Sequence, residues 1–377
     1  MLIIGIIVGL FVLVFLVAAH ELGHAIVAKR NGVVVEEFGI GFPPRAWAKK
    51  LKNGVLFTLN WLPLGGFVKL QGEHDAADKK GDYGAATFWQ KTKILFAGVV
   101  VNWLIAVVLL SILAVTGLPK IIANQFTIPS DTTVISAPVQ IGALTAGYPA
   151  EKAGIKTGDK ILKFDGETID STAELIEVSK AHRGETVPVV YERNNKQTTV
   201  NVALRDSSGG VFGATLGQRE SIKATWSAPI VGVVTTAQYT WVTVQGLGQL
   251  LGDFFGGLLG QLSTTQTGRD EATEKLDKAG ASVAGPIGIL GVIFPAASEA
   301  GFSQVVFLAA IISLTLAVMN TLPIPSLDGG RWFVTALFRV MKKPLTKERE
   351  ESIHGTGFMV LLCLIVLVTV ADVFKLF

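Results

Sequence analysis

A His-Glu-x-x-His motif occupies residues 20–24, near the end of an apolar run that begins at Leu2. On an α-helix, positions i and i+4 share one face, so His20 and His24 can direct two imidazole nitrogens at a single ion. Glu21 follows His20 directly, where its carboxylate can reach a water on that ion. Imidazole ligands with an open fourth position favour zinc. The motif therefore predicts a zinc hydrolase site with Glu21 as general base.

Two simpler interpretations of this stretch have to be weighed. The histidines could be ordinary polar residues at a helix end, but ionisable groups in an apolar span are costly and usually functional. Residues 1–19 could be a cleaved signal peptide, since Val17-Ala18-Ala19 resembles a cleavage site. A signal peptide has basic residues before its apolar core, whereas Lys and Arg first appear at Lys29-Arg30. That order favours a retained span with its N-terminus outside.

The composition indicates an integral membrane protein with at least one soluble module. Half of the 377 residues are hydrophobic, and the mean hydropathy is +0.49; both values are high for a soluble chain. The single cysteine, Cys363, excludes an intrachain disulfide. No basic tract of the nucleic-acid-binding kind occurs, so we expect no nucleic-acid partner.

Four stretches could each cross about 30 Å of hydrocarbon, namely residues 1–28, 93–118, 302–341 and 356–376. The third is interrupted by Pro323, Pro325 and Gly329-Gly330, which forbid a continuous helix. Asp328 is the one carboxylate in the interruption. An isolated Asp-Gly is usually a turn, but a carboxylate buried in a span needs a cation. Asp328 is therefore the candidate third metal ligand.

The loop at residues 29–92 is basic and rich in β-forming sequence. Eleven basic residues face six acidic ones between Lys29 and Lys93, so the positive-inside rule places this loop in the cytoplasm. Glycine, proline and Asn53-Gly54 turn signals separate four short β-prone runs, at Val33–Ile40, Ala46–Leu51, Val55–Leu59 and Phe67–Leu70. The loop is also unusually aromatic. We expect a small sheet dipping into the membrane beside the metal; the alternative is a hairpin on the lipid surface.

The segment from Lys120 to about Arg219 has the composition of a soluble domain. Strand and turn signals alternate, with a helix expected near Thr172–His182 and strands at Val187–Glu192 and Thr198–Leu204. Residues 128–206 resemble a PDZ domain of the bacterial protease-associated kind. Such domains bind extended peptides by strand addition and hold a chain terminus with backbone N–H groups.

Residues 220–300 are apolar in part but interrupted by polar side chains. A crossing here would place the later basic residues, from Arg331 to Arg349, outside the cell, against the charge rule. We therefore expect extracytoplasmic helices associated with the membrane surface and a linker, with residues 263–282 forming a polar loop.

Taken together, these motifs resemble the site-2 protease family of zinc intramembrane metalloproteases, in the bacterial branch with an extracytoplasmic PDZ domain. The resemblance covers almost the whole chain. One departure is Gly98-Val99-Val100-Val101-Asn102, where the family has Gly-Pro before the asparagine. The motifs that carry the resemblance are His20-Glu21-Leu22-Gly23-His24, Gly39-Ile40-Gly41-Phe42-Pro43, Pro63-Leu64-Gly65-Gly66-Phe67, Gly285-Pro286-Ile287-Gly288 and Asn320-Thr321-Leu322-Pro323-Ile324-Pro325-Ser326-Leu327-Asp328-Gly329-Gly330.

The resemblance implies a polytopic α-helical membrane protein with about four spans, a membrane-associated β-sheet loop and one inserted PDZ domain. It implies a Zn²⁺ endopeptidase in the bacterial cytoplasmic membrane, with both termini and the PDZ domain outside. Its substrates would be single-pass membrane proteins, of the anti-sigma-factor or remnant-signal-peptide type, already shortened by a site-1-type protease. The PDZ domain would exclude bulky outer domains.

The remaining site residues are expected to contact substrate. Asn320 and Asn102 could bind substrate backbone or a developing oxyanion, although Asn102 could instead bond a neighbouring helix. Pro323 and Pro325 are the other candidates, because they break the third span beside Asp328. The rival from another class is a non-catalytic PDZ-bearing membrane scaffold that captures chain termini. A metal transporter is disfavoured, because few further polar residues are available to line a path across the bilayer.

Overall fold

The computed structural model describes residues 2–207 and 209–376. The chain divides into two compact units. One contains the residues up to Ile112 together with those from Pro229 onward, and the other is Leu113–Ala228. Each unit is described separately below.

Among the described residues, four helical stretches of the first unit are long and apolar enough to cross a membrane, or five if a bent helix pair at residues 266–300 counts as one span. This agrees with the four predicted spans and confirms the polytopic helical class. The four are α1 (Leu2–Arg30), α2–α3 (Phe88–Leu95 and Ala97–Thr116), α10 (Phe302–Thr321) and α12 (Lys347–Leu376).

In two of these spans the helix begins several residues before the apolar segment that predicted it. Helix α2 starts at Phe88 because Thr87 and Gln90 form a capping box there. Helix α12 starts at Lys347, and acidic residues in its first turn, Glu348 and Glu350, favour the positive end of the helix dipole. Polar turns thus extend both spans beyond their apolar cores.

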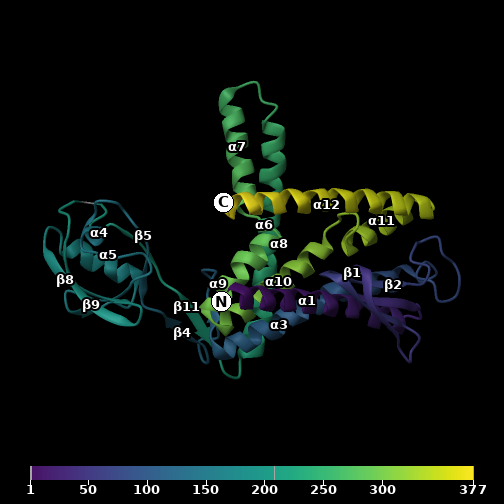
Figure 1. The fold of residues 1–377 in the computed structure, drawn as a ribbon, viewed down its shortest axis with the longest axis horizontal. Helices are drawn as coiled ribbons and strands as arrows, with labels where there is room; N and C mark the ends of the chain where they lie inside the picture. Colours follow the sequence, from purple (N-terminus) through teal and green to yellow (C-terminus); the bar gives the residue numbers. More distant parts are fainter. Residues whose placement is uncertain (1, 208, 377) are drawn as a thin grey trace. The chain divides into compact units, whose positions relative to one another are not determined.

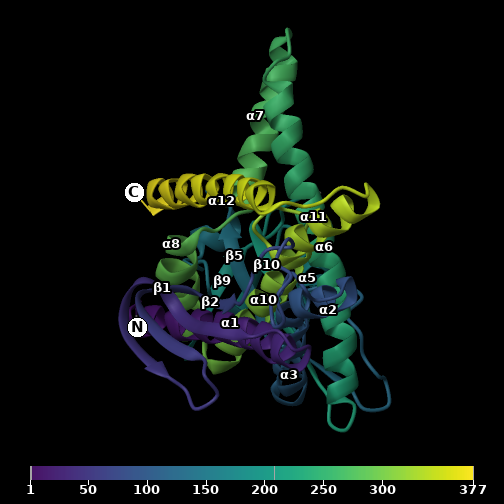
Figure 2. The same ribbon diagram turned by 90° about the vertical axis from the view of Figure 1, so that its right-hand side faces the viewer.

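The basic loop at residues 29–92 contains one long antiparallel hairpin, formed by β1 (Val35–Lys50) and β2 (Leu56–Leu70). Four separate short runs were predicted there. Asn53-Gly54 lies in the turn between the two strands, as predicted, whereas the breaks predicted at residues 41–44 and 63–66 are bends within continuous strands. Gly41 and Gly65 adopt positive φ values of 79° and 107° there, and the pairing shifts register along the hairpin. Strand β2 packs against α1, as Figure 2 also shows.

Residues 228–300 form a chain of helices, which the sequence could not delimit. The elements are α6 (Ala228–Gly260), α7 (Gln266–Ala281), α8 (Pro286–Gly288), the π-helix η1 (Ile289–Ile293) and α9 (Phe294–Ala300). The prediction of a polar loop at 263–282 is wrong. Thr265 caps α7, and the Glu274–Lys278 pair at 2.7 Å supports a helix without an apolar face. In Figures 1 and 2, α6 and α7 run across the direction of α1 and α12.

Helix α9 lies close against α1. A Cβ atom added to Gly5 would lie 2.4 Å from the Pro295 Cα, and one added to Gly9 would lie 2.6 Å from the Phe294 ring. Only glycine permits this approach. After α10, the chain breaks at residues 322–327 and resumes as α11 (Asp328–Val340). The expected interruption of the third span therefore ends at Asp328.

The second unit contains a six-stranded sheet of order β10-β5-β6-β8-β9, with β7 paired to β6, and a three-stranded sheet of order β3-β11-β4. Along β8, Val187, Val189 and Tyr191 alternate into the core, which is the period of a half-buried strand. The strands are β3 (Leu118–Pro119), β4 (Thr133–Ser136), β5 (Val139–Leu144), β6 (Lys160–Phe164), β7 (Glu167–Thr168), β8 (Thr186–Arg193), β9 (Lys196–Ala203), β10 (Ala214–Gly217) and β11 (Glu220–Lys223).

The short α4 (Pro149–Lys152) and α5 (Thr172–Ala181) complete this unit as an α+β domain with the strand and helix pattern expected of a PDZ domain. The boundary predicted at residue 206 is too early, because β10 pairs with β5 and belongs to the same sheet. Sequence patterning missed β10 because its four residues carry too short an alternation to separate a strand from a turn.

Candidate metal centre

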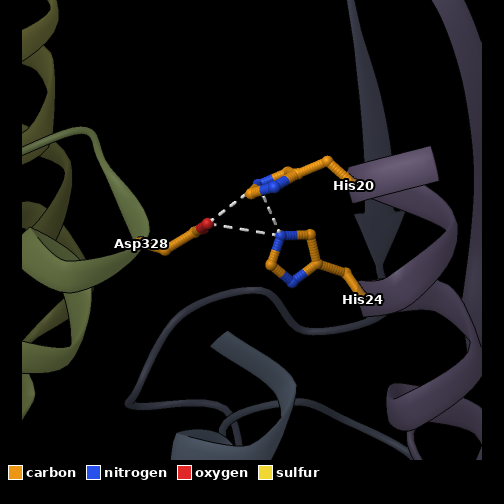
Figure 3. A group of neighbouring side chains, drawn as sticks. All are labelled: His20, His24 and Asp328. Atoms are coloured by element: carbon orange, nitrogen blue, oxygen red, sulfur yellow. Dashed lines mark hydrogen bonds and ion pairs between the residues drawn. The ribbon is translucent and has the colours of Figure 1, made fainter. Parts of the chain in front are cut away.

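Two distant segments of the first unit bring His20, His24 and Asp328 together (Figure 3). The two histidines project from one face of α1, and Asp328 is the first residue of α11. The His20 and His24 Nε2 atoms are 3.1 Å apart. Asp328 Oδ2 lies 3.1 Å from the first and 3.3 Å from the second. Both imidazoles are more than nine-tenths buried.

This triangle has the dimensions of a zinc site. Ligands at 2.0–2.1 Å in a tetrahedron lie about 3.3–3.4 Å apart, close to the three observed separations. The donor chemistry agrees with the geometry. His24 Nδ1 lies 2.7 Å from the Ile94 carbonyl oxygen, which can only accept, so Nδ1 donates and Nε2 keeps its lone pair. In the neutral imidazole that lone pair faces a carboxylate oxygen, and a metal cation or a proton between the two acceptors satisfies both of them.

Helix α3 lies against the two imidazoles through Gly98. A Cβ at this position would lie 2.5 Å from His24 Nε2 and 2.7 Å from His20 Nδ1. Real side chains do not approach so closely, so the position requires glycine. Sequence reasoning named Gly98 only as part of a motif. Its spacing to Asn102, four residues later on the same helix face, was the available signal.

Asn102 is buried beside His20, with its side-chain nitrogen 3.5 Å from His20 Nδ1. Its Oδ1 is without a hydrogen-bond partner among the residues that the structure describes. The Asn102 backbone carbonyl accepts a bond of 2.8 Å from the Ser313 hydroxyl, which joins α3 to α10. Contact of Asn102 with substrate stays a prediction.

The turn that carries Asp328 is held from two sides. On one side, the Ser326 N–H, in a residue with φ of 85°, donates to His354 Nδ1 of α12 at 3.1 Å. On the other, Arg331 of the first α11 turn reaches the Glu73 carboxylate at 2.7 Å. Sequence reasoning missed Glu73, Arg331 and His354, since no local pattern connects residues so far apart in the chain.

The other predicted site residues lie around this centre with fewer contacts. Glu21 lies beside β2, and a Cβ added at Gly66 would be 3.4 Å from its Cγ. The Asn320 amide donates to the Leu316 carbonyl of its own helix at 2.9 Å. Pro323 is exposed and Pro325 half-buried. Their roles stay predictions.

The fold and this centre define a polytopic membrane protein with a His-Glu-x-x-His metal site closed by a distant aspartate. Residues 8–364 match the model of peptidase family M50. The chain belongs to this family, which is the site-2 protease family, and it is a zinc metalloendopeptidase of the bacterial membrane.

Relatives agree over nearly their whole length. The chain is 31% identical to a Clostridium perfringens protein whose name proposes a zinc metalloprotease, with 95% of each chain covered. It is 28% identical to zinc metalloprotease RasP of Geobacillus kaustophilus, with 97% of each chain covered. It is 25% identical to the regulator of sigma-W protease RasP of Bacillus subtilis, with 97% of this chain and 98% of that protein covered.

Among solved structures, the PDZ domain of an SdrC-like protein from Listeria monocytogenes matches with 25% identity and a TM-score of 0.19. The match covers 21% of this chain and 86% of that domain. The corresponding Listeria innocua domain matches with 24% identity and a TM-score of 0.20. We assign the PDZ fold from the strand order of the second unit rather than from these scores.

Proposed function

We propose that this enzyme cleaves single-pass membrane proteins within their spans, as a late step of regulated intramembrane proteolysis. The observation that carries the proposal is the meeting of His20, His24 and Asp328 inside a membrane unit. A substrate reaching that centre has to come from the bilayer. The finer assignment, to anti-sigma factors or remnant signal peptides, draws on the sigma-W regulator name of the Bacillus subtilis relative.

In this proposal His20, His24 and Asp328 hold the metal, with Glu21 beside it. Zinc held by these three residues would polarise the scissile carbonyl and lower the pKa of a water. The Glu21 carboxylate takes a proton from the attacking water and delivers it to the leaving nitrogen. Asn320 and Asn102 bind substrate backbone, and Pro323 and Pro325 line its path.

A transmembrane helix hides its peptide bonds, so the substrate must unwind before cleavage. An extended substrate recovers backbone hydrogen bonds by pairing with a strand edge. Hairpin β1–β2 offers such an edge, because it has only two strands and β2 packs against the helix that bears Glu21. This makes the hairpin the substrate-binding element of the proposal.

The proposed topology follows the charge distribution. The basic loop at residues 29–92 lies in the cytoplasm, and both termini and the PDZ domain lie outside. The PDZ domain binds peptide termini and excludes substrates with large outer domains. An upstream protease of the site-1 type therefore has to shorten the substrate first.

The test is co-expression with two single-span reporters, one carrying a folded outer domain and one a short stub. Wild type should cleave the stub reporter only. Glu21→Gln should retain zinc and lose cleavage by about 10²–10⁴-fold, the usual contribution of a general base. Glu274→Gln, which alters an exposed pair with Lys278 on α7, is the matched control. Near-normal cleavage by Glu21→Gln would remove Glu21 as the base.

A further inference from the structure

We infer that a cationic cavity at the C-terminal end of α11 binds the phosphate-bearing headgroup of an anionic phospholipid. The cavity measures about 270 Å³ and lies between α2, the loop before it, and the end of α11. It is separate from the metal centre and from the hairpin β1–β2. Its charged and aromatic lining comes from Asp75, Phe88, Lys91, Arg339 and Lys343.

The lining carries an excess of positive charge. Lys91 is buried and already paired with Asp75. Arg339 and Lys343 are exposed, and the ion pairs found among the described residues include neither of them. Two cations with no carboxylate partner at one small cavity repel each other unless an anion lies between them. A phosphate group, with several acceptor oxygens, suits a guanidinium and an ammonium together.

The position of Arg339 is set by packing as well as by charge. Its guanidinium carbon lies 5.2 Å from the centre of the Phe88 ring, over the first residue of α2. Stacking of this kind orients a guanidinium. Lys343 follows one turn later, after Lys342 reverses the chain with a φ of 55°. Both cations line the cavity.

The surroundings favour a lipid over a soluble phosphate. Apolar side chains on the two helices that border the cavity are exposed, including Trp89 at 72%, Val340 at 80% and Leu337 at 41%. In a membrane protein these side chains face acyl chains. Basic pockets at the cytoplasmic ends of membrane helices are typical sites for acidic headgroups. With its headgroup in the cavity, the lipid would place its acyl chains against Leu337 and Val340.

The site also adjoins the contacts that hold the metal-site turn. The Asp75 N–H donates to Glu350 Oε2 at 2.7 Å, and Glu350 Oε1 lies 3.7 Å from Arg331 Nε. Asp75 in turn pairs with Lys91 of the cavity wall. A bound headgroup would thus contact Lys91, the first residue of a series of polar contacts that runs through Asp75 and Glu350 to Arg331. The inference of binding does not depend on the proposed substrate or on catalysis.

The test measures lipid binding by the full-length protein, purified in detergent, with native mass spectrometry. Phosphatidylglycerol should be retained in preference to phosphatidylcholine. The double substitution Arg339→Gln with Lys343→Gln should weaken phosphatidylglycerol binding by roughly 30-fold, since each cation near an acidic lipid contributes about 1 kcal/mol. Lys343→Arg should retain binding. The matched control, Lys29→Gln with Arg30→Gln, removes two exposed cations at the end of α1.

Three outcomes would overturn the inference. An equal loss in the control would indicate general surface attraction. Unchanged binding in the double variant would place the lipid elsewhere. Full displacement by millimolar inorganic phosphate would indicate a soluble anion. Should the double variant not fold, a photoreactive phosphatidylglycerol can be crosslinked to wild type. Crosslinks should then fall in peptides containing Trp89 or Val340, and crosslinks confined to other helices would contradict the site.

Discussion

Arg331 lies one helical turn after Asp328, and its guanidinium donates two hydrogen bonds to Glu73. One bond, of 2.7 Å, goes to the carboxylate, and the other, of 3.0 Å, goes to the backbone carbonyl. Glu73 lies three residues after the end of β2 at Leu70, and its other carboxylate oxygen accepts the Leu70 N–H at 3.2 Å. The contact therefore joins the hairpin that borders Glu21 to the helix that begins with Asp328.

This contact predicts that Glu73 and Arg331 position the third metal ligand. Glu73→Gln or Arg331→Gln should lower zinc affinity by about 10-fold or more, as is usual for residues that support a ligand. Chelator competition on purified protein measures this. Lys69→Gln, which removes an exposed pair of the same loop, should leave affinity unchanged. Equal zinc affinity in all three variants would show that the contact serves only folding.

Replacing Asp328 tests the ligand set itself. Asp328→Asn keeps the size of the side chain but removes the negative charge that two imidazoles approach within 3.3 Å. Elemental analysis should find well below one zinc ion per protein chain. The variant His20→Ala shows the zinc content expected when one ligand is removed. Full zinc occupancy in Asp328→Asn would exclude Asp328 as a ligand.

The close approach of α3 to both imidazoles makes Gly98 a position of the site that tolerates no side chain. Gly98→Ala would place a methyl group 2.5 Å from His24 Nε2, so an imidazole must move. We expect zinc loss together with at least 100-fold lower reporter cleavage. Gly246→Ala on α6, where no atom lies within 4 Å of the added carbon, is the control. Normal zinc content in Gly98→Ala would contradict this packing.

Asn102 should orient His20. If His20 Nε2 holds the metal, its Nδ1 carries the proton and needs an acceptor. Turning the Asn102 amide by 180° would bring the unpartnered Oδ1 to face Nδ1. Asn102→Leu should then weaken zinc binding about 10-fold, whereas Asn102→Asp should retain it. Equal weakening by both changes would contradict the acceptor role.

In the PDZ domain, the buried Asp159 pairs with Arg193 at 2.6 Å. Burial alone would raise the pKa of Asp159, but hydrogen bonds from Arg193 and the Lys156 amide outweigh it and hold that pKa below its usual value. A depressed pKa stabilises the fold above the unfolded-state pKa of about 3.9 and loses that effect as the pH falls through the folded-state pKa.

Arg193→Gln should therefore destabilise the PDZ domain at neutral pH and destabilise it less near pH 3. Hydrogen exchange of peptides spanning β6 and β8 in the full chain measures the opening free energy. Lys160→Gln, which alters a more exposed pair with Glu192, is the control. A loss of stability that did not shrink at low pH would contradict the linkage.

The sequence by itself determined what local patterns can specify. An i, i+4 spacing places His20 and His24 on one face of α1, and apolar length alone gives the four spans. Alternation along β8 and β9 indicated a PDZ-type sheet. Two prolines marked the break before Asp328, whereas Gly329 and Gly330, which were predicted to belong to the break, lie in the first turn of α11. Each of these signals lies within a single helix, strand or turn, so it does not depend on a contact between distant segments.

Only the tertiary structure decided which distant residues meet. Asp328 lies 308 positions from His20, yet the side chains are 3.1 Å apart. The fit of Gly98 against both imidazoles, the Glu73–Arg331 contact, and the pairing that joins β10 to β5 likewise depend on packing between segments. A propensity describes a residue and its neighbours, whereas these contacts exist because helices and strands bury their faces against one another.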